Sequence, residues 1–165
     1  MTNEPPPTSA RLAAPAAADT VVREIHIEAS PETVWEFFVD PEKVVRWKGV
    51  ATEIDLRPGG RRWLDMHGDR DIAVGEHTVI DPPHHIGFTW GWEGDDLVPP
   101  GSSTVDVYLT PQGTGTLVRL EHSGLPDAEQ CEKHGAGWTH YLGRLEVAAV
   151  GGDPGPDAFA EPPAE

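Results

Sequence analysis

The segment over residues 29–47 constrains the fold of this chain most, because it predicts two short helices that abut directly. Ser30 is a favourable N-cap, since its hydroxyl can accept a hydrogen bond from a first-turn amide. Pro31 fits the first helical position, where its missing N–H costs nothing. The Asp-Pro pair at 40–41 ends this helix, because proline disfavours helical geometry in the preceding residue, and it begins a second helix over 42–46.

Strand patterns surround this helix pair. One precedes it at 21–28, and six more follow, each bounded by glycine, proline or aspartate residues that favour turns. The six segments lie at 51–57, 61–67, 72–80, 85–93, 103–110 and 116–123. Consecutive hairpins of this kind predict an antiparallel sheet of about seven strands, which would be strongly twisted and curved.

A long helix is predicted from Pro126 to about Ala149, where apolar residues recur with a 3.6-residue period. Gly135, Gly137 and Gly143 each disfavour this helix by roughly 1 kcal/mol relative to alanine. We expect close packing or room for a ligand to offset that cost. The fold class is therefore α+β, with a curved sheet wrapped around a C-terminal helix.

The chain length of 165 residues suits one domain with a single core. Residues 1–19 are rich in proline and alanine and show no periodicity, so we predict a disordered tail there. Residues 151–165 have the same character with additional acid, which predicts a second, acidic tail. The folded domain is expected to span residues 20–150.

Charge and composition exclude several classes of partner. Twelve basic residues against 28 acidic ones give a net charge of −16, which repels nucleic acids and anionic membranes. No run approaches the roughly 18 apolar residues that a membrane-spanning helix needs, and the N-terminus lacks a signal-peptide pattern. A single cysteine, Cys131, allows neither an internal disulfide nor a multi-cysteine zinc site. These features predict a soluble cytoplasmic protein without membrane insertion.

Several motifs, in order along residues 21–149, resemble one known superfamily. They are IEASPE at 27–32, DPE at 40–42 leading to Trp47, RPGG at 57–60, DPP at 81–83, FTW at 88–90, HSGL at 122–125 and GW at 137–138. Together they resemble the START/Bet v 1-like (SRPBCC) helix-grip superfamily, and within it the homologues of the heat-shock-protein-90 ATPase activator. The resemblance implies a helix-grip fold with a hydrophobic cavity between the sheet and the long helix.

Aromatic side chains are the main candidates for lining such a cavity. The expected set is Trp47, Trp63, Phe88, Trp90, Trp92, Trp138 and Tyr141. The direction of Trp63 is ambiguous, because Leu64 and Met66 compete for the inward side of its strand. A cavity of this kind suits a mostly apolar ligand with a few polar contacts, whereas the alternative is that the rings fill a solid core.

Two histidines lie on apolar faces, His122 on the last strand and His134 on the long helix. They are candidates for orienting a ligand or exchanging a proton, although hydrogen-bonded core histidines are the favoured interpretation. Arg62 shares a face with Leu64 and Met66 and is a candidate for binding a carboxylate or enolate. A solvated surface arginine is nevertheless favoured for both Arg62 and Arg119.

A metal site is not predicted, and neither is a cofactor. His84 and His85 are adjacent and therefore point apart on a strand. Asp65, His67, Asp69 and Asp71 form an acidic cluster around one predicted turn, which we interpret as solvated turn residues rather than acid–base groups.

The leading hypothesis is a non-enzymatic protein that binds a small hydrophobic or amphipathic molecule in the helix-grip cavity. No catalytic residue is assigned. One alternative is a cyclase-like or hydrolase-like enzyme that uses the same cavity with Arg62, His122 and His134 as its polar groups. A second alternative is a co-chaperone or a self-sacrificing resistance protein, and the sequence leaves any protein partner open.

Overall fold

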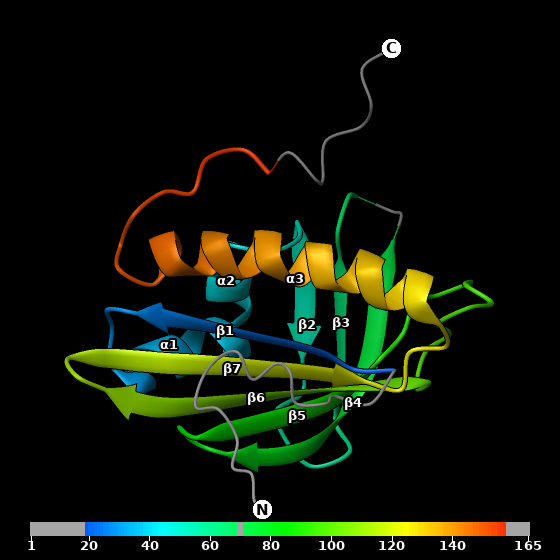
Figure 1. Cartoon of the computed structure of the whole chain (residues 1–165), viewed down its shortest axis with the longest axis horizontal. Helices are drawn as coiled ribbons and strands as arrows, with labels where there is room; N and C mark the ends of the chain where they lie inside the picture. Colours follow the sequence, from blue (N-terminus) through cyan, green and yellow to red (C-terminus); the bar gives the residue numbers. More distant parts are fainter. Residues whose placement is uncertain (1–18, 69–70, 158–165) are drawn as a thin grey trace, which may run out of the picture.

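Seven antiparallel strands and one long helix form the framework of the fold (Figure 1). The computed structural model describes residues 19–68 and 71–157. Its elements are β1 (Val21–Ile27), α1 (Pro31–Val39), α2 (Pro41–Val44), β2 (Ala51–Ile54), β3 (Arg61–Asp65), β4 (Ile72–Asp81), β5 (His85–Trp90), β6 (Ser103–Gln112), β7 (Gly115–Ser123) and α3 (Ala128–Ala148). The strand order is β1-β7-β6-β5-β4-β3-β2, and α3 runs along one side of the curved sheet. The predicted α+β helix-grip layout is confirmed.

The two abutting helices form as their caps predict. The Ser30 hydroxyl accepts a hydrogen bond from the Thr33 amide at 3.2 Å. The Asp40 carboxylate accepts one from the Glu42 amide at 3.0 Å, so Asp40 ends α1 and caps α2. Helix α1 buries an apolar face against the sheet, whereas α2 is a single turn that ends at Val44, shorter than predicted.

Two strands end three residues earlier than predicted, β2 at Ile54 and β5 at Trp90. Strand β5 was predicted to reach residue 93. A Cβ atom at Gly91 would lie 1.9 Å from the carbonyl oxygen of Pro99, so the following loop folds back closely on this glycine. Trp92 is held by the same loop, because its amide donates to the Val98 carbonyl at 2.7 Å, and it bridges to Ala73 of β4.

Helix α3 packs its apolar face, which includes Trp138, Leu142 and Leu145, onto the sheet. Close packing accounts for Gly135, where a Cβ atom would lie 2.4 Å from Nη2 of Arg23 on β1. At Gly137 and Gly143 a Cβ atom would meet nothing within 4 Å. The structure thus separates one glycine that allows a close approach from two that leave open space.

Replacing Gly143 with alanine is expected to raise the free energy of unfolding by about 1 kcal/mol, because alanine favours the helix and no neighbour obstructs its methyl group. Gly135→Ala should gain less, since its methyl group displaces the Arg23 guanidinium from its 2.9 Å hydrogen bond to Thr139. Urea unfolding followed by circular dichroism measures both. Equal gains for the two variants would contradict this account.

The described residues 151–157, which follow α3, contact this helix. Asp157 accepts hydrogen bonds from the Tyr141 hydroxyl and the His140 ring, each at 2.7 Å. Nη1 of Arg144 donates to the carbonyl oxygen of Gly155 at 3.0 Å. The rest of the predicted acidic tail (158–165) and residues 1–18 of the predicted N-terminal tail lie outside the described residues. Among the described helices, none is long and apolar enough to cross a membrane.

Candidate functional site

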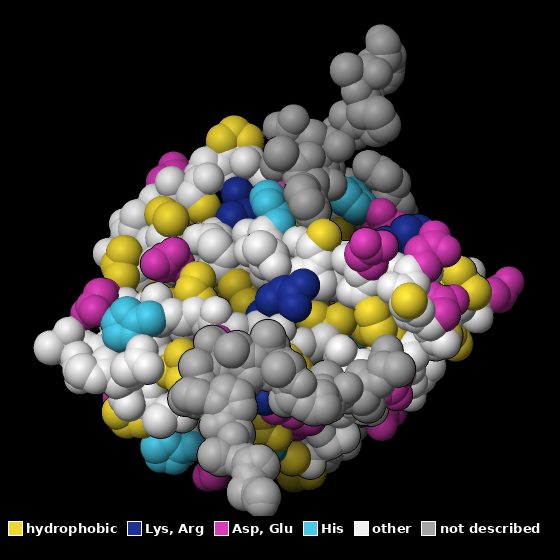
Figure 2. Space-filling model, in the orientation of Figure 1, with side chains coloured by type: hydrophobic (Ala, Val, Ile, Leu, Met, Phe, Trp, Pro, Cys, Tyr) yellow, Lys and Arg dark blue, Asp and Glu magenta, His cyan; other side chains and the backbone are white. Residues whose placement is uncertain are grey.

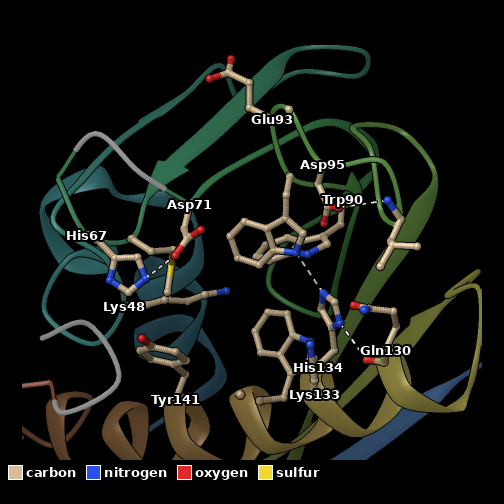
Figure 3. Close-up of a pocket in the computed structure, with 16 residues that line it drawn as sticks. Lys48, His67, Asp71, Trp90, Glu93, Asp95, Gln130, Lys133, His134 and Tyr141 are labelled. Carbon is tan, nitrogen blue, oxygen red and sulfur yellow. Dashed lines mark hydrogen bonds and ion pairs between the residues drawn. The ribbon is translucent and has the colours of Figure 1, made fainter. Parts of the chain in front are cut away.

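A cavity of about 710 Å³ opens between the N-terminal half of α3, the end of β5 with its following loop, and the segment between β3 and β4 (Figure 3). Its apolar lining consists of Met66, Trp90, Trp92, Leu97, Trp138 and Tyr141. Gly137 also lines the cavity, and a Cβ atom there would meet nothing within 4 Å, so the absence of a side chain leaves this space open. The volume is within the range of roughly 300–1,000 Å³ that is typical of small-molecule sites.

The sequence-predicted residues divide between this large cavity and its surroundings. Those that line it are Trp90, Trp92, His134, Trp138 and Tyr141. Trp47 and Phe88 instead border a small cavity of about 30 Å³ that lies deeper, towards α1 and α2, and Trp90 and Trp138 line both.

Trp63 and His122 do not line the large cavity. Trp63 borders the small one, but its Nε1 donates to the carboxylate of Glu53 at 3.2 Å on the exposed side of the sheet. Leu64 and Met66 take the inward side of this part of the chain, which settles the direction that the sequence left ambiguous. His122 is fully buried in β7 and lines neither cavity.

His122 belongs to a closed hydrogen-bond chain. Its Nδ1 accepts from Nε1 of Trp138 at 3.0 Å. The Ser103 hydroxyl donates to the Trp90 carbonyl at 2.8 Å, so Nε2 of His122 must donate to that hydroxyl oxygen, also at 2.8 Å. Both ring nitrogens are therefore used by the neutral imidazole, and burial lowers its pKa to about 2, assisted by the nearby His134 and Lys48. This geometry is that of a paired core histidine.

His134 is also held neutral, but at the cavity wall. Its Nδ1 donates to the Gln130 carbonyl at 2.8 Å, and its Nε2 accepts from Nε1 of Trp92 at 3.0 Å. Burial lowers the pKa of the ring. The histidine thus fixes the indole of Trp92 against the cavity. Figure 3 draws the hydrogen bonds of His134 as dashed lines.

The neutral burial of His122 predicts a loss of stability in mild acid. Its folded-state pKa lies below the ordinary value of 6.5, so the unfolded chain binds the proton more tightly and stability falls as the pH drops below 6.5. This group alone should remove about 2 kcal/mol of unfolding free energy between pH 7 and pH 5. Urea unfolding across this range gives the slope of the unfolding free energy against pH. In His122→Gln this slope should be shallower, corresponding to the uptake of up to one proton fewer on unfolding. An unchanged slope in that variant would contradict the assignment.

Lys48 is the main site residue that the sequence analysis missed. It follows Trp47 directly, and only 6% of it is exposed. Its Nζ lies 3.8 Å from the ring centre of Trp138 and 4.3 Å from that of Trp90, with Trp47 and Tyr141 just under 6 Å away. Burial lowers its pKa well below the usual range, and the charge of Arg62 adds to this. Lys48 lines both cavities.

Arg62 corrects the prediction of a solvated surface side chain. Its guanidinium carbon lies 4.2 Å from the ring centre of Phe88, and Nη2 donates to the Phe38 carbonyl at 3.0 Å. Burial lowers its pKa to about 10, and it borders the small cavity. Arg119 does lie on the outer side, where it pairs with Glu24 and Glu121 at 2.9 and 2.8 Å.

The predicted acidic cluster stands at the cavity mouth and in the adjoining turn. The Asp65 carboxylate accepts from the amides of His67 and Gly68, which is a turn-forming role. His67 pairs with Asp71 at 2.7 Å, and both line the cavity, whereas Asp69 lies outside the described residues. Within residues 19–68 and 71–157, no three His, Cys, Asp or Glu side chains are placed to hold a metal ion.

Comparison with known proteins shows which family has this architecture. Residues 28–149 match the family model described as activator of Hsp90 ATPase homolog 1-like protein. The solution structure of an AHSA1-like protein from Rhizobium etli is 47% identical, with 88% of this chain and 91% of that chain covered and a TM-score of 0.69. None of the curated proteins matches the chain.

Two further solved structures are more distant. DynU16, a protein of the dynemicin biosynthetic locus, is 27% identical over 82% of this chain and 49% of that chain, with a TM-score of 0.72. An HSP90 activator from Plasmodium falciparum is 24% identical over 80% of this chain and 96% of that chain, with a TM-score of 0.65, and shows likeness of fold alone. The family match over most of the folded domain and the Rhizobium relative agree with the helix-grip architecture. The chain therefore belongs to the AHSA1-like family, a branch of the SRPBCC/Bet v 1-like superfamily.

Proposed function

We propose that this protein binds a small hydrophobic or amphipathic molecule in the large cavity between the sheet and α3. The observation that carries the proposal is an open space of about 710 Å³ with the rings of Trp90, Trp92 and Trp138 on its walls. Aromatic walls favour apolar or aromatic ligands, because they bury large areas without many polar contacts. The similarity to a protein of a biosynthetic locus supports a small organic molecule as the ligand.

The histidine geometry favours binding over catalysis. The enzymatic alternative relied on Arg62, His122 and His134 as polar groups, but the hydrogen bonds of both histidine rings are already made within the protein. Arg62 borders the small cavity and does not line the large one. A general acid or base must instead reach the substrate proton, directly or through one water. The two histidines therefore act in positioning the cavity walls rather than as free acid–base groups.

Titration with N-phenyl-1-naphthylamine, a neutral apolar dye that fluoresces when bound, tests the proposal. We expect saturable dye fluorescence with energy transfer from the cavity tryptophans. Gly137→Leu should weaken dye binding at least tenfold, because Gly137 lines the cavity and a side chain there would occupy it.

The matched control is Gly143→Leu on the same helix. A Cβ atom at Gly143 also meets nothing within 4 Å, but this residue does not line the large cavity. Both variants gain similar helix propensity, so a general change in α3 affects them alike. Absence of saturable binding to the wild type, or an equal loss in the two variants, would refute the proposed function.

A further inference from the structure

The cavity contains a buried lysine whose amine pairs with no described carboxylate. Lys48 is 6% exposed, and neither a hydrogen bond nor an ion pair joins its Nζ to any residue within 19–68 and 71–157. Figure 3 shows its ammonium group directed from the cavity wall towards the middle, above the ring of Tyr141. A buried charge without a partner is costly, and aromatic faces offset only part of that cost. This position therefore favours the binding of an anion or a strong hydrogen-bond acceptor.

Two other donors lie around the same point. The indole N–H of Trp90 is buried and has no hydrogen-bond partner among the described residues. Arg62 borders the small cavity with Lys48 and makes its hydrogen bonds to a backbone carbonyl and a histidine, with no described carboxylate as its partner. Buried donors are nearly always paired, so the Lys48 amine and the Trp90 N–H, neither of which has a partner among the described residues, point to an acceptor from outside the chain.

The size of the small cavity indicates which acceptor fits. Its free volume is about 30 Å³, and Lys48, Trp90 and Trp138 border both it and the large cavity. One water-sized group needs about 10–15 Å³ of such volume, so there is room for about two oxygen atoms. A carboxylate is an acceptor of this small size, and it can accept from an ammonium and an N–H at once.

We infer that the ligand is an apolar organic acid whose carboxylate sits beside Lys48 at the junction of the two cavities, with its body against Trp92 and Trp138. This assignment rests on the proposed function and names its ligand class. It accounts for the burial of two cations in a chain whose net charge is −16.

The charges at the cavity mouth act differently from Lys48. Asp71, Glu93 and Asp95 line the mouth together with Lys133, and Figure 2 shows acidic side chains gathered near the N-terminal end of α3. Charges at a solvated mouth are screened by salt, so they modulate the approach of an acid more than its final affinity. The buried ammonium interacts in a low-dielectric setting, where a charge-assisted hydrogen bond is much stronger.

An isosteric pair of probes, 2-naphthoate and 2-naphthamide, tests the inference by displacement of N-phenyl-1-naphthylamine at pH 7. The two differ in charge but hardly in shape. Wild-type protein should bind the acid at least tenfold more tightly than the amide. In Lys48→Met, which keeps the length and apolar character of the side chain, this preference should disappear while the dye still binds.

Lys43→Met is the matched control, because it removes the same charge from a surface lysine that pairs with Glu36. It should retain the wild-type preference. Equal affinities for acid and amide in the wild type, no displacement by either, or a preference that persists in Lys48→Met would overturn the inference while leaving the proposed function intact. Loss of the preference in Lys43→Met as well would assign it to net charge and overturn the role of Lys48. Failure of the dye itself to bind would instead refute the proposed function.

Discussion

Replacing Lys48 with methionine is expected to raise the free energy of unfolding of the ligand-free protein by about 1–3 kcal/mol at pH 7. The wild-type side chain carries its amine into a site bounded by four aromatic rings, where burial disfavours the charged form. Methionine fills a similar volume without charge. Equilibrium urea unfolding of the two proteins measures the difference. A variant less stable than the wild type would contradict this account of Lys48.

The pH dependence of this difference has a definite sign. The folded-state pKa of Lys48 lies below its ordinary value of 10.5, so below that pH the unfolded chain binds the proton more tightly than the folded protein does. The penalty from Lys48 is therefore present at neutral pH and vanishes as the pH rises towards 10.5. We expect the stability gain of Lys48→Met to shrink between pH 7 and pH 10. A gain that is constant or increases over this range would argue against a buried, unpaired amine.

Replacing Trp138 with alanine should lower the free energy of unfolding by about 3–5 kcal/mol, the usual cost of deleting a buried tryptophan. Trp138 is 4% exposed, packs against Trp90 and donates to His122 at 3.0 Å. Trp138→Phe keeps most of the ring but leaves Nδ1 of His122 without its donor, so a smaller loss of about 1–3 kcal/mol is expected.

Trp63→Ala provides the comparison for Trp138→Ala, because it removes a tryptophan that is only partly buried and lies at the exposed side of the sheet. Thermal and urea unfolding of the three variants should show the largest loss of stability in Trp138→Ala. The loss should be smaller in Trp138→Phe, and the loss in Trp63→Ala should not exceed that in Trp138→Phe. If Trp138→Ala costs less than Trp63→Ala, Trp138 does not hold the helix to the sheet as described here.

Local signals predicted most of the fold. Ser30 and Asp40 cap consecutive helices through interactions within three residues in the chain, so the helix pair could be located from sequence. The end of β5 could not, because it depends on the approach of the Pro99 carbonyl to Gly91 across a loop. Element identity is thus encoded locally, whereas the length of this strand is decided by a tertiary contact.

The candidate site could also be predicted only in part, because local periodicity located some of its residues and tertiary contacts decided the others. Period-two alternation placed Trp90 and Trp92 on one wall, and the helical stripe placed Trp138 and Tyr141 on the other. Lys48 follows a one-turn helix and belongs to no periodic pattern, and lysines are almost never fully buried, so nothing in the sequence singled it out.

Arg62 and His122 show a different limit of sequence reasoning. The alternation gave the correct side for Arg62, but the usual preference of arginine for the surface outweighed it. For His122, the inward direction was predictable, whereas its role depended on Ser103 and Trp138, which lie 19 and 16 residues away in sequence. Partners at such separations are fixed only by the folded sheet and helix.

The most direct test of the central claim, that the large cavity is a ligand site, is a titration of ¹⁵N-labelled protein with N-phenyl-1-naphthylamine followed by the indole N–H resonances of its six tryptophans. The account predicts saturable shifts for Trp90, Trp92 and Trp138, which line the cavity, and none for Trp35 and Trp63, which do not. Shifts confined to Trp35 or Trp63, or an unchanged spectrum at saturating probe, would contradict it.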